Sequence, residues 1–166
     1  MDAALTQLET LYRELGPALL AYFRRQRTLA GAAEDLLQDT FVRAFRGWER
    51  LNHAASARAY LFGIARHVSL DALRALRPTV ELIEERAAAP APDPEDPRIE
   101  PMRAAIAALP EAHRETLLLK LQHELSYEEI AHVLDLPVGT VRSRLHHAVN
   151  QLRATLNPPP TKGSPS

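Results

Sequence analysis

Six polar side chains stand within eight residues near the C-terminus of the chain. They carry hydroxyl, guanidinium and imidazole groups, and they are Thr140, Arg142, Ser143, Arg144, His146 and His147. A guanidinium can donate two hydrogen bonds to a base edge or pair with a phosphate, and hydroxyl groups bond to either. Helical spacing turns Val141, Leu145 and Ala148 inward and leaves the polar set outward. The pattern indicates contact with DNA, although a helical hairpin with a solvated face would use the same residues.

Two short helices joined by a tight turn must position this set. Ser126 followed three residues later by Glu129 is a capping box, which marks the start of the first helix. Apolar residues then recur on one face of that helix. Residues 136–139 supply the turn, with Pro137 suited to the first position of the second helix. This order predicts a helix-turn-helix, whose second helix reads base edges in a DNA groove.

The composition favours helices and limits the chemistry. The 166 residues are 46% hydrophobic but only 5% aromatic, and they include no cysteine. We therefore expect an all-α protein without disulfides or thiolate ligands. The seven histidines show no convincing ligand spacing, so we assign no metal and no other cofactor. No apolar run approaches the ~20 residues that span a bilayer, so we expect a cytoplasmic protein with no membrane insertion.

The net charge of −1 is low for a nucleic-acid-binding protein, and it is unevenly distributed. Residues 1–77 contain 11 arginines and 8 acidic residues, whereas residues 78–102 contain 2 arginines and 7 acidic residues. Residues 103–157 are balanced at 6 of each sign. Autonomous DNA-binding proteins rely on phosphate neutralisation for affinity. Either the chain does not bind DNA, or a larger partner supplies the nonspecific affinity.

Glycine, proline and apolar periodicity divide the first half of the chain. Gly16-Pro17 should interrupt a first helical run. An amphipathic helix should cover 33–46, and its buried face is expected to be Leu36, Leu37, Phe41, Ala44 and Phe45. A loop from Gly47 to Ala55 should precede a helix that Ser56 caps and that runs to about Arg77.

The second half begins after a stretch that cannot hold a helix. Five prolines among acidic residues and alanines indicate a semi-extended linker. From Met102 a second helical unit should begin, with an interruption at Leu109-Pro110. The expected organisation is therefore two small helical domains, at 1–77 and 103–157. An acidic, proline-rich linker at 78–102 joins them, and a disordered tail follows at 158–166.

Two further helical faces carry mixed polar and apolar side chains. On the helix over 33–46 the composition suits a protein partner, and the outward residues are Asp35, Gln38, Asp39, Val42, Arg43 and Arg46. On the helix over 56–77 an outward row alternates arginines with apolar side chains, namely Arg58, Phe62, Arg66, Leu70, Arg74 and Arg77. Such a row can grip a strand backbone and support unstacked bases. A merely solvated face remains the alternative for the helix over 33–46.

These segments, in this order, resemble the extracytoplasmic-function (ECF) sigma factors of bacterial RNA polymerase, in the sigma-70 family. Residues 33–45 resemble the polymerase-binding helix of the family, and residues 60–74 resemble its promoter-melting and minus-ten helix. Residues 108–119 and 125–131 resemble its minus-thirty-five domain. The tightest match is Pro137-Val-Gly-Thr-Val-Arg-Ser-Arg-Leu145. The resemblance covers nearly everything from Leu11 to Leu156.

The resemblance implies a subunit for transcription initiation, and not an enzyme. Its partners would be bacterial core RNA polymerase, promoter DNA and a cognate anti-sigma factor, and the free chain would be a monomer. The clamp helices of the largest polymerase subunit would contact the outward face of the helix over 33–46.

The resemblance also assigns the DNA-binding residues. The minus-ten strand would contact Asn52, His53, Arg58, Phe62, Arg66, His67, Arg74 and Arg77. Asn52 and His53 are favoured for a pocket that holds a flipped base, whereas Trp48 is expected in the core. The minus-thirty-five element would contact Ser126, Tyr127 and the six polar residues of 140–147.

Several positions depart from the family pattern. Tyr60 and His67 replace a tryptophan and an asparagine that are common in the melting helix, and His146-His147 replace basic residues. A sigma-like protein without initiation activity therefore stays open as an alternative. A stand-alone helix-turn-helix regulator would need more positive charge to bind DNA unaided. An enzyme with a DNA-binding tail would need a nucleophile beside a base or paired carboxylates, and the sequence shows neither.

Overall fold

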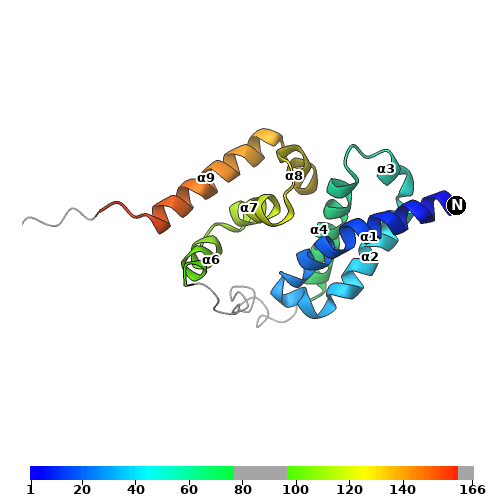
Figure 1. Cartoon of the computed structure of the whole chain (residues 1–166), viewed down its shortest axis with the longest axis horizontal. Coiled ribbons are helices and arrows are strands. Elements are labelled where there is room, and N and C mark those ends of the chain that lie inside the picture. The colour runs from blue at the N-terminus through cyan, green and yellow to red at the C-terminus, as the bar shows by residue number, and fades with distance from the viewer. Residues whose placement is uncertain (77–96, 161–166) are drawn as a thin grey trace, which may run out of the picture.

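The computed structural model describes residues 1–76 and 97–160, and all regular elements within these ranges are helices. They are α1 (Asp2–Arg24), the 3₁₀ helix η1 (Arg27–Ala32), α2 (Ala33–Arg46), α3 (Trp48–Asn52), α4 (Ala57–Ala75), α6 (Ile99–Ala107), α7 (Glu111–His123), α8 (Tyr127–Leu134) and α9 (Val138–Leu156). Figure 1 shows α1 to α4 packed as one group and α6 to α9 as a second, with α8 against α4. The all-α prediction is confirmed. Residues 77–96 and 161–166, which include Arg77 and most of the predicted linker, lie outside the described residues.

Apolar residues of α1, α2 and α4 form the core of the first group. Leu19, Phe23 and Leu61 are fully buried there. On α2 the buried stripe includes Thr40, whose hydroxyl donates a hydrogen bond to the Leu36 carbonyl (2.8 Å), so its polar atom is satisfied. Phe45, predicted in the buried face, is instead 41% exposed, because it lies at the edge of the stripe that α2 turns inward.

Two local predictions were wrong. Helix α1 continues through Pro17, with no break at Gly16-Pro17. The fixed proline φ is compatible with a helix and costs one hydrogen bond plus some crowding, which the burial of residues on both sides of Pro17 offsets. The segment from 48 to 52, predicted as part of a loop, forms the short helix α3. Leu51 holds that helix against the core, where it is 3% exposed.

The second group begins earlier than predicted, at Ile99 rather than Met102. Pro101 fits the first turn of α6, where its missing N–H would have no acceptor within the helix. The interruption at Leu109-Pro110 is confirmed, because Pro110 directly precedes α7. In the part of the chain that the structure describes, no helix is both long enough and apolar enough to cross a membrane.

Candidate nucleic-acid interface

Helices α8 and α9 form the predicted helix-turn-helix. The Glu129 amide donates to Ser126 Oγ (3.1 Å) and the Ser126 amide donates to Glu129 Oε1 (3.0 Å), so the capping box is confirmed. Helix α8 ends at Leu134 and is followed by its C-cap Asp135, whose φ of 53° lies in the left-handed region. The Leu136 amide then donates to the Ala131 carbonyl (2.9 Å), which satisfies an acceptor at the helix end. These bonds fix the angle at which α9 leaves the turn.

Helix α9 presents the predicted base-reading set. Its buried residues are Val141, Leu145 and Ala148, as predicted, and they set the rotation of the helix. Pro137 precedes the helix by one position, rather than occupying its first turn. The polar set divides by exposure: Thr140 and Arg144 are half-buried, whereas Arg142, Ser143, His146 and His147 are exposed.

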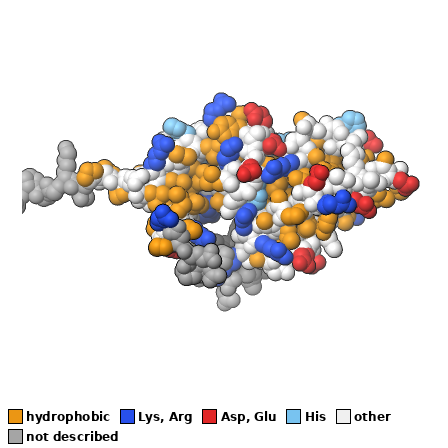
Figure 2. Space-filling view, in the orientation of Figure 1, with side chains coloured by type: hydrophobic (Ala, Val, Ile, Leu, Met, Phe, Trp, Pro, Cys, Tyr) orange, Lys and Arg blue, Asp and Glu red, His pale blue; other side chains and the backbone are white. Residues whose placement is uncertain are grey.

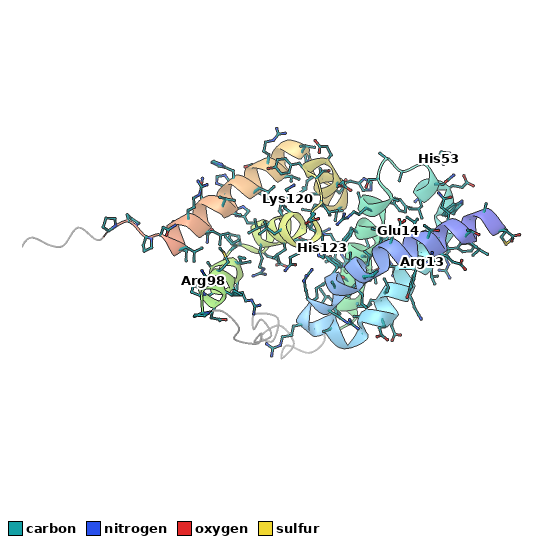
Figure 3. The ribbon with its side chains drawn as sticks, viewed as in Figure 1. Arg13, Glu14, His53, Arg98, Lys120 and His123 are labelled. Carbon is teal, nitrogen blue, oxygen red and sulfur yellow. The ribbon has the colours of Figure 1, made fainter. Side chains whose placement is uncertain are left out.

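A basic side chain that sequence reasoning missed joins this surface. The Lys120 ammonium lies 5.2 Å from the centre of the Tyr127 ring, and the Arg142 guanidinium lies 5.9 Å from the same ring. Cations near an aromatic face are attracted by its quadrupole. Figure 3 shows Lys120 on α7. The sequence around Lys120 does not indicate this position, because its place beside Tyr127 depends on how α7 packs against α8.

The histidines of α9 sit close to one another and to α7. The rings of His146 and His147 are 5.9 Å apart, and His147 stacks on His113 of α7 at 6.0 Å and 15°. Asn150 Nδ2 lies 3.1 Å from His146 Nε2. Among the described residues, no three His, Asp or Glu side chains come together as metal ligands would.

The row predicted on α4 does not lie open to solvent. Phe62 is fully buried, and Arg58 donates a hydrogen bond to the His123 carbonyl of α7. Arg66 Nε donates to Glu115 Oε1 at 2.7 Å, and the two side chains are 26% and 32% exposed. The expectation that these three residues face outward was therefore wrong, because α7 and α8 cover them. Farther along α4 the side chain of Arg74 is 69% exposed.

The segment predicted to capture a flipped base borders an open depression. Asn52 and His53 are exposed at the end of α3, as Figure 3 shows for His53, and Trp48 packs against the core as predicted. The depression measures about 540 Å³, and neither Asn52 nor His53 lines it. Its lining is Arg43, Arg46, Gly47, Glu49, Arg50, Tyr60, Ile64 and His67. A Cβ on Gly47 would lie 2.9 Å from the Tyr60 hydroxyl, so the absence of a side chain allows this close approach.

The outward face of α2 combines charge with two exposed apolar side chains. Asp35, Gln38 and Arg46 are exposed, and Val42 is 47% exposed beside Phe45. Arg43 is not free, because it donates to Asp39 (3.3 Å) and to Asp71 of α4 (2.9 Å). The hydrogen bond from Arg43 lowers the pKa of Asp71 below its ordinary value. Arg43 and Asp39 therefore brace α2 against α4 as well as contributing to the surface.

An interdomain interface joins the two helical groups. Its first-group residues are Tyr22, Ser56, Arg58, Phe62 and Arg66, and its second-group residues are Glu115, His123 and Glu129. Ser56 Oγ donates to Glu129 Oε2 at 2.7 Å. The His123 ring lies 4.9 Å from Phe62 and 5.8 Å from Tyr22. Figure 3 shows His123 on the side of α7 that faces the first group.

Burial and charge shift three pKa values at this interface. Burial, and then the charges of Arg25 and Arg58, lower the pKa of His123 from 6.5 to about 4. Burial also raises the pKa of Tyr22. Burial alone would raise the pKa of Glu129, but hydrogen bonds from Ser56 and Ser126 lower it below the ordinary value. At neutral pH the interface therefore holds a neutral imidazole and an ionised carboxylate.

Two parts of the chain match known protein families. Residues 11–79 match the family Sigma-70 region 2, and residues 99–152 match the family Sigma-70, region 4. These ranges contain the first and second helical groups respectively, apart from the ends of α1 and α9.

Curated relatives are similar over most of their length. The ECF RNA polymerase sigma factor SigC of Mycobacterium tuberculosis is 37% identical over 135 residues, which cover 77% of this chain and 72% of that protein. SigL of Mycobacterium tuberculosis is 34% identical over 162 residues, covering 93% and 90%. The RNA polymerase sigma factor YlaC of Bacillus subtilis is 29% identical over 158 residues, covering 90% and 91%.

Solved structures agree with this assignment. The sigma factor RpoE from Bartonella quintana, in complex with the anti-sigma factor NepR, aligns with a TM-score of 0.70 at 25% identity, over 90% of this chain and 96% of that chain. CnrH in complex with the cytosolic domain of CnrY aligns with a TM-score of 0.62 at 25% identity, over 93% and 92%. The chain therefore belongs to the ECF sigma factors of the sigma-70 family.

Proposed function

We propose that this sigma factor binds bacterial core RNA polymerase in the cytoplasm and directs promoter recognition, DNA melting and transcription initiation. The single observation that carries the proposal is the order of three surfaces along one chain. A mixed face on α2 is followed by an arginine and aromatic row on α4, and then by the helix-turn-helix of α8 and α9. The chain would supply binding and positioning, and the polymerase would supply the catalytic groups.

Residues 103–157 would read the minus-thirty-five element in the major groove. Thr140, Arg142, Ser143 and Arg144 lie in the first turns of α9, where a recognition helix contacts base edges. The remaining contacts in this proposal come from Ser126, Tyr127, His146 and His147. Lys120 is added to them because it flanks Tyr127 together with Arg142.

Residues 1–77 would hold the melted minus-ten strand. The proposed contacts remain Asn52, His53, Arg58, Phe62, Arg66, His67, Arg74 and Arg77. The depression between α2, α3 and α4 supports a base pocket at this point, since three arginines and an aromatic ring line it. An extruded base needs an aromatic or apolar surface to replace its lost stacking, and Tyr60 can supply one.

The polymerase contact would lie on α2. Its centre would be Val42 and Phe45, with Asp35, Gln38, Asp39, Arg43 and Arg46 around them. An apolar centre with a charged rim is the usual anatomy of a protein interface. We further propose a cognate anti-sigma factor as a regulatory partner, because the similar sigma factor RpoE was solved in complex with the anti-sigma factor NepR.

Run-off transcription tests the proposal directly. Bacterial core polymerase is incubated with a library of promoter fragments, with and without the purified chain, and the transcript starts are sequenced. Starts at a shared sequence that depend on the chain support the proposal. A gel shift without polymerase tests the alternative of a stand-alone regulator, which requires tight, sequence-specific binding by the chain alone.

A further inference from the structure

The surface proposed to hold the minus-ten strand is covered by the other half of the same chain. Arg58, Phe62 and Arg66 occupy successive turns of α4 and carry the groups suited to phosphates and bases. Each of the three contacts a residue of α7. Phe62 has no exposed surface at all in this arrangement. A nucleic acid strand and the second helical group therefore cannot occupy this face of α4 at the same time.

The covering contacts follow one register along α4. Ser56 contacts Glu129 at the start of the helix, Arg58 contacts the His123 carbonyl about half a turn on, and Arg66 contacts Glu115 about two turns farther. The partner residues run in the opposite direction along the sequence. The contacts thus form a continuous strip along α4 rather than one isolated contact.

The groups that cover α4 resemble the groups of a nucleic acid strand. A carboxylate from Glu115 pairs with Arg66 through Nε at 2.7 Å and Nη2 at 3.5 Å, as a phosphate would pair with a guanidinium. The flat His123 ring lies against Phe62 with the centroids 4.9 Å apart and the ring planes tilted by 46°, in the space that an unstacked base would need. Glu129 adds a second carboxylate against the Ser56 hydroxyl.

From this correspondence we infer that the strip Glu115, His123 and Glu129 is an intramolecular mimic of the minus-ten strand that keeps the free sigma factor closed. The inference rests on the proposed function, because it takes Arg58, Phe62 and Arg66 as strand contacts. Engagement with the polymerase separates the two helical groups, and the strand then replaces the mimic.

The interface combines polar contacts with apolar packing. Its hydrogen bonds join polar and charged groups, as in interfaces between domains that move, while the buried apolar residues of both helical groups form one continuous cluster. An open pocket of about 240 Å³ borders it, lined in part by Leu70, Leu73 and Leu118, so the two helical groups do not pack closely along this edge. Arg58 Nε is also buried without a hydrogen-bond partner among the described residues, so this arrangement does not satisfy the whole guanidinium.

Closure leaves the helix-turn-helix surface accessible. Helix α9 packs on α6, α7 and α8, and its polar residues Arg142, Ser143 and His146 remain exposed. The mimic should therefore suppress binding to a single strand without suppressing binding to a duplex. This difference separates a strand mimic from a general loss of folding or charge.

A charge reversal in the strip provides the first test. Glu115→Lys places a like charge beside Arg66, and Glu100→Lys makes the same change on the exposed start of α6 as a matched control. The probe is a pool of short, fluorescein-labelled single-stranded DNA of mixed sequence, with a duplex pool beside it. We expect Glu115→Lys to bind the single strand about tenfold more tightly than the wild type, since the loss of a partly buried pair shifts a closed-to-open ratio by that order. The inference is overturned if binding to the single strand rises equally in the Glu100→Lys control. It is also overturned if binding rises in neither variant.

A reversible cross-link provides the second test, and it does not depend on the stability of Glu115→Lys. The chain contains no cysteine, so Ser56→Cys and Glu129→Cys place a unique thiol pair across the interface. A short thiol-reactive linker that contains a disulfide holds the chain closed, and a reductant releases it. We expect the linked protein to lose binding to the single-stranded pool and to recover it on reduction, while duplex binding stays the same. A linked protein that binds the single strand as well as the reduced one overturns the inference.

Run-off transcription with core polymerase distinguishes a failure of the closed mimic from a failure of the proposed sigma-factor function. If the linked and the reduced protein both initiate, the closed mimic is wrong but the sigma-factor function stands. If the wild-type chain fails to initiate on any promoter and the opened chain binds no single strand, both the proposed function and the inference fall.

Discussion

Lowering the pH should open the interdomain interface through a single side chain, His123. This ring is 4% exposed between Phe62 and Tyr22, and burial, then Arg25 and Arg58, lower its pKa from 6.5 to about 4. The closed form therefore binds fewer protons than the open form. Closure is fully favoured above pH 6.5 and is progressively lost as the pH falls from 6.5 to 4.

The size of the effect follows from these two pKa values. At pH 5 the ring would be almost fully protonated in the open form but mostly neutral in the closed form. Relative to pH 7.5, the closed-to-open ratio should fall about 30-fold, or by about 2 kcal/mol, for a pKa shift from 6.5 to about 4. Glu129 stays ionised in this range, since its pKa lies below the ordinary carboxyl value.

Energy transfer between two dyes measures this ratio. Arg13→Cys on α1 and Arg153→Cys on α9 are exposed positions in different helical groups, and no native cysteine competes for the labels. We expect transfer to fall between pH 7.5 and pH 5 in the labelled chain. His123→Phe keeps a ring against Phe62 but cannot titrate, so its transfer should stay constant. If the phenylalanine variant opens with the same pH profile, another group controls closure and the reasoning is wrong.

Three further predictions test the separate surfaces. Arg142→Ala should lower promoter-specific transcription about tenfold, because a base or phosphate contact by arginine contributes about 1–3 kcal/mol. The control Arg153→Ala, at the far end of α9, should leave transcription unchanged. Neither variant should reduce co-purification with polymerase. Val42→Glu should abolish that co-purification while circular dichroism shows an unchanged fold, because the side chain is 47% exposed; retained binding would remove α2 from the polymerase contact. Gly47→Ala should lower the thermal midpoint, since its Cβ would lie 2.9 Å from the Tyr60 hydroxyl, and Tyr60→Phe in the same chain should restore part of the loss.

Val42 is a cleaner test of the polymerase surface than the charged residues around it. Asp39→Arg would also remove a carboxylate from Arg43, which ties α2 to Asp71 of α4. A loss of polymerase binding in that variant could come from a shifted helix. Val42 makes no such bridge, so a loss of polymerase binding in Val42→Glu reports on the α2 surface itself.

Local sequence was sufficient for the helix-turn-helix. The capping box pairs Ser126 with Glu129 over three residues, and the burial of Val141 and Leu145 follows from helical spacing alone. Errors arose where tertiary packing overrides a local preference. Pro17 is tolerated within α1 because residues on both sides of it are buried, and packing selects Thr40 over Phe45 on α2.

The interdomain interface could not be predicted from local patterns. Arg66 and Glu115 are 49 residues apart, Arg58 and the His123 carbonyl 65, and Ser56 and Glu129 73. No periodicity links positions so distant, and Glu115 looks like any exposed acid on an amphipathic helix. The same limit explains why Phe62 was expected to face outward. The spacing correctly placed it in line with two arginines, but spacing does not reveal what lies opposite.

The cover on α4 has a physical rationale that connects it to the charge of the chain. A bare row of Arg58, Phe62 and Arg66 would bind single-stranded RNA and DNA with little sequence preference. On the face shown in Figure 2, basic side chains are scattered among acidic and apolar ones, and the whole chain has a net charge of −1. Long-range attraction to nucleic acid is therefore weak, and the exposed row would be the main source of unwanted binding. Pairing it with Glu115 and the ring of His123 removes that source until the polymerase holds the two helical groups apart.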